Sequence, residues 1–318
     1  MERRPGYYAP LIGITTAVFA AALTGFVVIG DSWWALALAP VFAVVFTHFG
    51  FIGHDAGHGQ ILTSKRANNV IGYLHGNLLI GLGYGWWTGK HNAHHANPNH
   101  ETRDPDVQIG AVAFTADQSL GRRGLVGFIT RHQAVLFFPL LLLEGLSLRI
   151  AAVQSVLQNE VKNRGLEATL LGLHTVLYFG TVFAVLSPGK ALVFIVVQQG
   201  LFGLYLGCSF APNHKGMPIV SAEDQLDPVR RQVLTSRNIR GSTLVDYALG
   251  GLNYQIEHHL FTRMPRPNLR HAQPLVAAFC AHQGITYTET GLFESYAQTL
   301  RHLHAVSAPL RTGPTAGV

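Results

Sequence analysis

The sequence predicts an all-α integral membrane protein with four spanning helices, and three observations lead to this fold class. Only 13% of the 318 residues are charged and 48% are hydrophobic, whereas ordinary soluble domains carry about 25% charged residues. Four uncharged stretches each approach the ~20 residues that a helix needs to cross a bilayer. All but one of the Lys and Arg residues outside these stretches can be placed on the same side of the membrane.

The four stretches are predicted to form two helical hairpins. The first, 11–30, follows Arg3 and Arg4 and is longer than the apolar core of a signal peptide. It also lacks a convincing cleavage site, so we expect an uncleaved first helix. The others are 33–53, 168–186 and 191–210, and the turn from Ser187 to Lys190 joins the last two.

The cations predict the sidedness, because short cytoplasmic loops are enriched in Lys and Arg. With both termini in the cytoplasm, only Lys190 faces the other side. Two weaker apolar segments, 70–87 and 135–143, have inside-facing cations on both flanks, so we expect re-entrant or interfacial helices there, with Trp86 and Trp87 at the headgroup level.

The rest of the chain is predicted to complete a single membrane domain, residues 1–318. A helical cytoplasmic cap is expected over about 61–164 and 211–308, with a frayed tail at 309–318. Two cysteines exclude a disulfide framework and a Cys-rich zinc module. The net charge of +6 comes without a basic stripe with interleaved aromatic residues, so no nucleic-acid partner is expected.

Histidine is as common as carboxylate, with 17 His against 17 Asp and Glu. Three short motifs place histidines three or four residues apart, at i and i+4 in the first, at i, i+3 and i+4 in the second, and at i+3 and i+4 after a glutamine in the third. Such positions share one face of a helix and can point at one metal ion. All three lie just outside span ends on the predicted cytoplasmic side, so folding the hairpins together would bring them to one point. The motifs are His54-Asp55-Ala56-Gly57-His58, His91-Asn92-Ala93-His94-His95 and Gln255-Ile256-Glu257-His258-His259.

The number of histidines indicates the kind of site. Seven are too many for one tetrahedral zinc ion, which takes four ligands, and the count fits two metal ions. Imidazole donors favour Fe, Cu, Ni or Zn over Mg or Ca. Two alternatives remain: a zinc protease built on His54 and His58, which leaves the other motifs unexplained, and a non-catalytic metal carrier. The carrier predicts histidines along the spans, where only His48 and His174 lie.

The order of the motifs resembles that of the integral-membrane fatty acid desaturases. This resemblance covers about residues 46–267 and implies two iron ions in a diiron centre, which uses O2 to remove two hydrogens from an acyl-CoA or acyl-lipid chain. In that family a further iron ligand follows the last span, where His214 stands. We call the three histidine motifs, in chain order, the first, second and third box. Outside these boxes the features shared with the family are Trp86-Trp87, Asn97, Asp104-Pro105-Asp106, Leu234-Thr235-Ser236-Arg237-Asn238 and Met264-Pro265-Arg266.

Gln255 departs from the many family members that have His there, and it is similar to the front-end desaturases, which insert a double bond between an existing one and the carboxyl end. An amide can accept or donate a hydrogen bond, so Gln255 is either a weak metal ligand or a residue that orients a water. A diiron membrane hydroxylase or ketolase carries the same boxes and remains an alternative.

Ligating imidazoles usually give their second N–H to a carboxylate or carbonyl. The candidate partners near the boxes are Asp55, Asp104, Asp106, Asp246, Glu257, Asn92, Asn97 and Asn253. The sequence contains no flavin, nicotinamide or Cys-ligated cluster motif. We therefore expect an external electron donor of the ferredoxin or cytochrome type, with its reductase, which docks on the Arg-rich cap.

Overall fold

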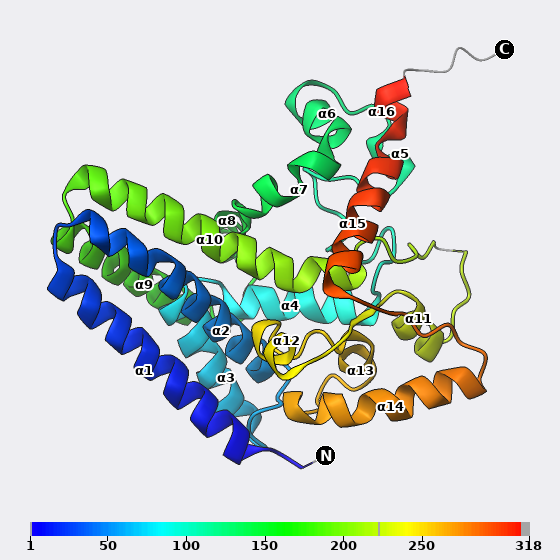
Figure 1. Ribbon diagram of the computed structural model, residues 1–318, viewed down its shortest axis with the longest axis horizontal. Coiled ribbons are helices and arrows are strands. Elements are labelled where there is room, and N and C mark those ends of the chain that lie inside the picture. The colour runs from blue at the N-terminus through cyan, green and yellow to red at the C-terminus, as the bar shows by residue number, and fades with distance from the viewer. Residues whose placement is uncertain (1, 222, 313–318) are drawn as a thin grey trace. The chain divides into compact units, whose positions relative to one another are not determined.

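The structure, a computed structural model, describes residues 2–221 and 223–312. Its elements, in chain order, are almost all helices (Figure 1). Among the described residues the only strands are β1 (Asn238–Ile239) and β2 (Glu289–Thr290), which pair in parallel. The predicted all-α class is confirmed. The helices are α1 (Pro5–Ile29), η1 (Trp33–Leu38), α2 (Ala39–Gly57), α3 (Lys65–Tyr73), η2 (Leu74–Leu79), α4 (Tyr84–Ala96), α5 (Ala116–Ser119), α6 (Gly124–Arg131), α7 (Gln133–Leu141), α8 (Glu144–Leu157), α9 (Arg164–Val185), α10 (Pro188–His214), α11 (Pro228–Leu234), α12 (Thr243–Ala248), α13 (Gln255–Leu260), α14 (Arg266–His282), α15 (Leu292–Val306) and α16 (Ala308–Thr312).

The chain divides into two compact units. Unit 1 comprises Met1–Gly89, Leu141–Cys208 and Arg263–Pro267, and unit 2 comprises Lys90–Leu140, Ser209–Thr262 and Asn268–Val318. The tail from Pro309, expected to be frayed, begins inside α16, and residues 313–318 lie outside the described residues.

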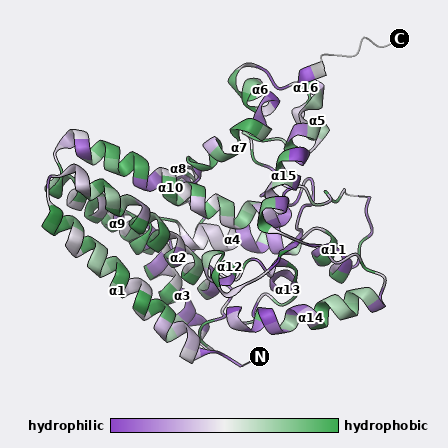
Figure 2. Ribbon diagram, viewed as in Figure 1, coloured by the Kyte–Doolittle hydropathy of each residue, from purple (hydrophilic) through white to green (hydrophobic). Residues whose placement is uncertain are grey.

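Within residues 2–221 and 223–312, four helical segments are long and apolar enough to cross a membrane, as predicted. They are Pro5–Ile29, Trp33–Gly57, Arg164–Val185 and Pro188–His214, and hydrophobic residues dominate them (Figure 2). Aromatic rings hold the unit 1 parts of three of them together: Phe26 of α1 lies 4.8 Å from Phe194 of α10 and 6.1 Å from Phe42 of α2 between ring centroids. These large buried rings supply much of the packing of unit 1.

The predicted re-entrant segment 70–87 consists of three short helices, α3, η2 and the first part of α4. Its turns are tied to helices α8 and α9 by buried polar contacts: the Nδ1 atom of His174 lies 2.9 Å from the carbonyl oxygen of Leu78, and Arg149 donates to the carbonyl of Ile80 at 2.8 Å. His174, a histidine inside a span, therefore binds backbone. Whether this segment enters the bilayer stays a prediction.

The second weak segment, 135–143, falls mostly in α7, which meets α6 at an angle of 103°. Several large apolar side chains on this bent pair are exposed, among them Leu125 (73%) and Val135 (80%). Gln133 anchors the corner between the two helices, because its side-chain amide donates to the carbonyls of Ala113 and Leu303 at 3.0 and 2.9 Å. The interfacial position of the pair also stays a prediction.

Close helix packing explains two of the glycines on α10. A Cβ atom at Gly203 would lie 2.7 Å from the carbonyl oxygen of Leu141 and 2.9 Å from the backbone nitrogen of Gly145, and one at Gly207 would meet the Leu141 side chain at 2.6 Å. The corner between α7 and α8 therefore packs closely against this face of α10.

We therefore expect Gly203→Ala to destabilise the protein by about 1–3 kcal/mol, because the new methyl group overpacks against backbone that cannot move away easily. The matched control is Gly200→Ala, where the nearest atom to the new Cβ is a leucine methyl at 3.6 Å. The control should be neutral or stabilising, since alanine is the better helix former. Thermal unfolding of the two variants in detergent checks the prediction, and equal midpoints would contradict it.

Candidate metal centre

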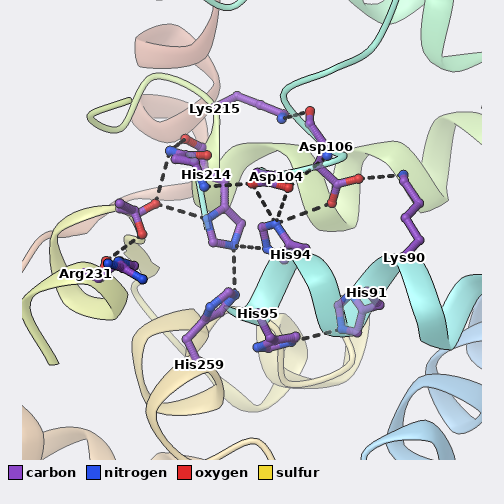
Figure 3. Close-up of polar contacts among 12 residues, drawn as sticks. Lys90, His91, His94, His95, Asp104, Asp106, His214, Lys215, Arg231 and His259 are labelled. Carbon is purple, nitrogen blue, oxygen red and sulfur yellow. Dashed lines mark hydrogen bonds and ion pairs between the residues drawn. The ribbon is translucent and has the colours of Figure 1, made fainter. Parts of the chain in front are cut away.

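Unit 2 gathers six of the predicted histidine ligands, and Figure 3 labels five of them, all but His258. Three come from the second half of α4, where the i, i+3, i+4 spacing does place them on one face. One is the last residue of α10 and two lie on the short helix α13. Five are buried and His91 is partly exposed; the six are His91, His94, His95, His214, His258 and His259.

Three of these imidazoles face one another through their Nε2 atoms. The Nε2 atom of His214 lies 3.3 Å from that of His94 and 3.1 Å from that of His259. One ring nitrogen from each of the three lies within 4.8 Å of the others, close enough to hold one metal ion. Sequence spacing alone could not show that these three, from three different helices, form one group.

The opposite nitrogen of each ring fixes its tautomer. The Nδ1 atom of His94 lies 2.9 Å from Oδ2 of Asp104, that of His214 lies 3.0 Å from the carbonyl oxygen of Thr235, and that of His259 lies 2.8 Å from Oε1 of Gln232. All three partners are acceptors, so each Nδ1 carries the proton and each Nε2 has a free lone pair. The oxygen and nitrogen of the Gln232 side-chain amide cannot be exchanged, because its NH2 group donates to the carbonyl oxygen of His95 at 2.9 Å.

The three lone pairs converge on one point, where a cation would be attracted by all of them. Burial and the neighbouring imidazoles also hold the pKa of His259 well below its ordinary value, so that the ring stays neutral. A neutral imidazole with its second nitrogen hydrogen-bonded is the form in which histidine binds a metal. The three residues therefore fit a transition-metal ion, and their donor set suits iron.

A second group lies beside the first. The Nε2 atom of His95 is 3.0 Å from that of His91, and the His95 and His258 rings are 4.8 Å apart between centroids. The histidines of the first box, His54 and His58, belong to unit 1, where their ring centroids lie 4.7 Å apart.

The tryptophan pair in unit 1 is partly buried, and its position at the headgroup level stays a prediction. Trp87 lies against His54, with 5.5 Å between ring centroids, and Trp86 packs on the core cluster that contains Ala152. Trp87 also explains the glycine in the first box, because a Cβ atom at Gly57 would meet this indole at 2.8 Å.

The loop after α4 orients two of the ligands at once. Asp104, fully buried, contacts His94 and accepts the backbone N–H groups of Asn99 (2.7 Å) and Asp106 (2.8 Å). Asn99 has φ +54°, a left-handed conformation that asparagine tolerates. Its side chain donates to the carbonyls of His214 (3.1 Å) and Thr235 (3.3 Å), so this turn connects the second box to the end of α10.

Asp106 forms an ion pair with Lys90 at 2.5 Å, and its carboxylate lies 3.6 Å from Nδ1 of His94. Burial would raise the pKa of Asp106, but the charges of Lys90 and Lys215 hold it below its usual range. Asp106 therefore adds a negative charge beside the histidine cluster.

The other expected partners of the ligands have different contacts. Asp246 accepts from Asn253 at 2.8 Å, and this pair braces the loop before α13. Glu257, whose pKa is raised by burial, accepts from the side chains of Asn238 (2.6 Å) and Tyr287 (2.8 Å). The physical reason is helical geometry, since Glu257 points away from the face that carries the histidines.

The expected asparagines also differ in their surroundings. Asn92 is exposed, and the side chain that donates to the carbonyls of His214 and Thr235 is that of Asn99, not of Asn97. In unit 1, Oδ1 of Asp55 lies 3.3 Å from Nδ1 of His54.

Arg237 is a residue whose role could not be seen in the sequence. It is fully buried and donates to the backbone carbonyls of Pro212 (2.5 Å) and Lys215. Its guanidinium group thus satisfies carbonyls at the end of α10 and brackets His214, a favourable place for a cation. Burial lowers its pKa to about 10, which leaves it charged at neutral pH.

We expect Asp104→Asn to weaken metal binding by about 10–100-fold, the usual cost of losing the partner of a ligating histidine. An amide at this position would turn an NH2 group toward one of the three N–H groups that Asp104 now accepts. Metal titration of the purified protein checks this result. Asp117→Asn, at an exposed aspartate of α5, is the control, and equal affinities for the two variants would contradict the role of Asp104.

The fold and the site together define an all-α membrane protein with a histidine cluster able to hold metal ions. Residues 31–291 match the family model described as fatty acid desaturase, and the chain belongs to that family. It is 30% identical to an acyl-lipid (9-3)-desaturase of Physcomitrium patens over 311 residues, 95% of this chain and 59% of that protein. It is also 26% identical to a Delta(8)-fatty-acid desaturase of Helianthus annuus (92% and 67% covered) and 28% identical to the Delta(6)-fatty-acid desaturase fat-3 of Caenorhabditis elegans (85% and 64% covered). The chain thus spans less than two thirds of the moss and nematode proteins.

Proposed function

We propose that the protein is an O2-dependent diiron desaturase that inserts a double bond into the acyl chain of a membrane lipid or acyl-CoA. The observation that carries the proposal is the convergence of the Nε2 lone pairs of His94, His214 and His259, each oriented through its Nδ1 atom. Family membership supplies the reaction class. The relatives' names, acyl-lipid and fatty-acid desaturase, support the substrate class.

The proposed ligand set has eight histidines. His94, His214 and His259 would hold one iron ion, while His91, His95 and His258 belong to the set of the other. His54 and His58 complete the eight on the strength of the box pattern. Two iron ions held in this way supply the redox chemistry that consumes O2 and two electrons, with the overall balance –CH2–CH2– + O2 + 2e⁻ + 2H⁺ → –CH=CH– + 2H2O.

The part played by the chain itself is positional. Asp104, Gln232 and the carbonyl of Thr235 hold a proton on the outer nitrogen of three imidazoles and so keep the inner nitrogens available. Burial of these rings excludes bulk water from the reacting centre.

We further propose that both termini and the histidine cluster face the cytoplasm. Lys190, the one loop cation assigned to the other side, forms an ion pair with Asp31 at 3.2 Å, which supports this sidedness because it leaves that turn with little net charge. The segments 61–164 and 211–308 then form the cytoplasmic part of a single membrane domain. A ferredoxin- or cytochrome-type protein with its reductase would deliver electrons there, attracted by the excess of arginine.

Expression in a host fed defined fatty acids, followed by mass spectrometry of the lipids, tests the function. We expect a product two mass units lighter than its precursor, formed only in air and absent with His94→Ala. An oxygenated product without any alkene would indicate a hydroxylase or ketolase. One zinc ion per purified chain, with full activity after His259→Ala, would indicate a zinc hydrolase. Bound metal without any acyl product under reducing, aerobic conditions would favour a metal carrier.

A further inference from the structure

Gln255, the residue at which the third box departs from many members of the family, reaches the metal centre of unit 2. It is the first residue of α13 and is buried. Its Nε2 atom lies 2.9 Å from Nε2 of His214, the nitrogen that also faces His94 and His259. A glutamine here can act in two ways: its oxygen can bind a metal ion, or its NH2 group can donate hydrogen bonds. The orientation of the amide decides between them.

A chain of hydrogen bonds fixes that orientation. It starts at the backbone carbonyl of Leu252, which can only accept. The side-chain nitrogen of Asn213 lies 2.9 Å from this carbonyl, so Asn213 must present its NH2 group there. The same nitrogen lies 3.2 Å from Oε1 of Gln255. The NH2 group of Asn213, which also lies 3.4 Å from the carbonyl oxygen of Ser209, holds the oxygen of Gln255 toward itself and leaves the NH2 group of Gln255 directed at His214.

The alternative orientations each create a clash of like groups. Reversing Gln255 alone would set its NH2 group against the NH2 group of Asn213. Reversing both amides would set the side-chain oxygen of Asn213 against the carbonyl oxygen of Leu252, at a distance where two acceptors repel. Because both contacts are buried, no bulk water relieves either arrangement.

We infer that Gln255 is a hydrogen-bond donor of the metal centre and not one of its ligands. An amide nitrogen has no available lone pair, so the group directed at the centre cannot bind a cation. Once the lone pair of His214 is given to a metal ion, the N–H groups of Gln255 require another acceptor. A water molecule or a small anion that enters the centre beside His214 provides it. The inference rests on the proposed metal centre and names a function for one residue of it.

This role also accounts for glutamine in place of histidine. An imidazole at position 255 would add a lone pair and fill a coordination position, whereas the amide leaves that position open and stabilises negative charge that arrives there. Gln255 thus belongs to the part of the centre that receives a water molecule or a small anion, and not to the part that holds the metal.

The test uses the purified full chain loaded with Co(II), with azide as the small-anion probe followed by absorption spectroscopy. Gln255→Leu should keep the metal content and change Co(II) affinity by less than about threefold, because no ligand is lost. Azide affinity should fall about tenfold or more, the value of one hydrogen bond to a charged acceptor. Asn213→Leu, which removes the anchor of the amide, should do the same to a smaller extent. Gln283→Leu, at an exposed glutamine after α14, should change neither quantity.

Two results would overturn the inference. Loss of a metal ion from Gln255→Leu, or a fall in Co(II) affinity as large as that of His94→Ala, would make Gln255 a ligand. If Gln255→Leu keeps its full metal content and binds azide as tightly as the wild type, Gln255 does not donate to the bound anion. The same conclusion follows if the metal-loaded wild type binds no azide. A wild-type chain that binds no metal would instead refute the proposed function, so the two failures are distinguishable.

Discussion

Replacing His94 by alanine is expected to empty one metal position and to lower product formation by more than ~100-fold. His94 contributes one of three converging Nε2 atoms, and its loss leaves His214 and His259 to hold a metal ion with two imidazoles. Loss of a residue that only orients a ligand already costs about 10–100-fold in such sites, so loss of the ligand itself should cost more. The spans contain no part of α4, so the variant should still insert into the membrane.

Iron content per chain, product analysis and membrane extraction together check this prediction. His282→Ala is the control, because His282 is exposed at the end of α14 and should be dispensable for metal binding. A His94→Ala protein with wild-type iron and wild-type turnover would show that the centre lies elsewhere. A variant absent from the membrane fraction would show that the histidine cluster is needed for folding.

Replacing Arg266 by methionine should destabilise unit 1 by about 3–5 kcal/mol, the usual cost of leaving one partner of a buried ion pair alone. A nitrogen of the Arg266 guanidinium lies 2.7 Å from Oδ2 of Asp55, and both side chains are at most 5% exposed. Asp55 also accepts from the hydroxyl of Tyr8 at 3.1 Å, and that hydroxyl accepts the backbone N–H of Arg266 at 3.2 Å. The Asp55 charge raises the pKa of Arg266 against the effect of burial, as expected for a strong pair.

The double variant Asp55→Asn/Arg266→Met tests whether the loss of stability comes from the unpaired charge of Asp55. Removing the charge of Asp55 removes the reason for the loss, so the double variant should recover at least half of the lost stability. Denaturation in detergent provides the measurement. Arg270→Met, one turn further along α14 and exposed, should be neutral. Equal loss in the single and double variants would mean that shape, and not the charge pair, is what Arg266 contributes.

The features that the sequence could predict are local ones. The spans follow from uncharged runs of helix-spanning length, and the ligand faces of α4 and α13 follow from histidines three and four residues apart. His214 was identified only through its position after the last span in the desaturase pattern. The helices α9 and α10 accordingly cover the expected spans, and the second and third boxes are helical.

The features that could not be predicted join distant parts of the chain. Gln232 contacts His259 and His95, which are 27 and 137 residues away, and Asn99 binds the carbonyl of His214 across 115 residues. Neither residue belongs to a motif with a metal-ligand spacing. Glu257 and Asp246 were expected beside imidazoles because they are close in sequence, but their helix faces and loops direct them to Asn238, Tyr287 and Asn253.

The ion pair between Asp55 and Arg266 has a consequence for biosynthesis. Asp55 leaves the ribosome 211 residues before Arg266, which at a translation rate of ~5–20 residues per second is a delay of roughly 10–40 s. Helix α2 therefore reaches the membrane while its carboxylate has no countercharge. Until Arg266 is made, the Asp55 carboxylate lacks the ion pair that it has in the folded protein. A chain that stops before Arg266 should thus be less stable in unit 1 than the full chain, for want of this ion pair.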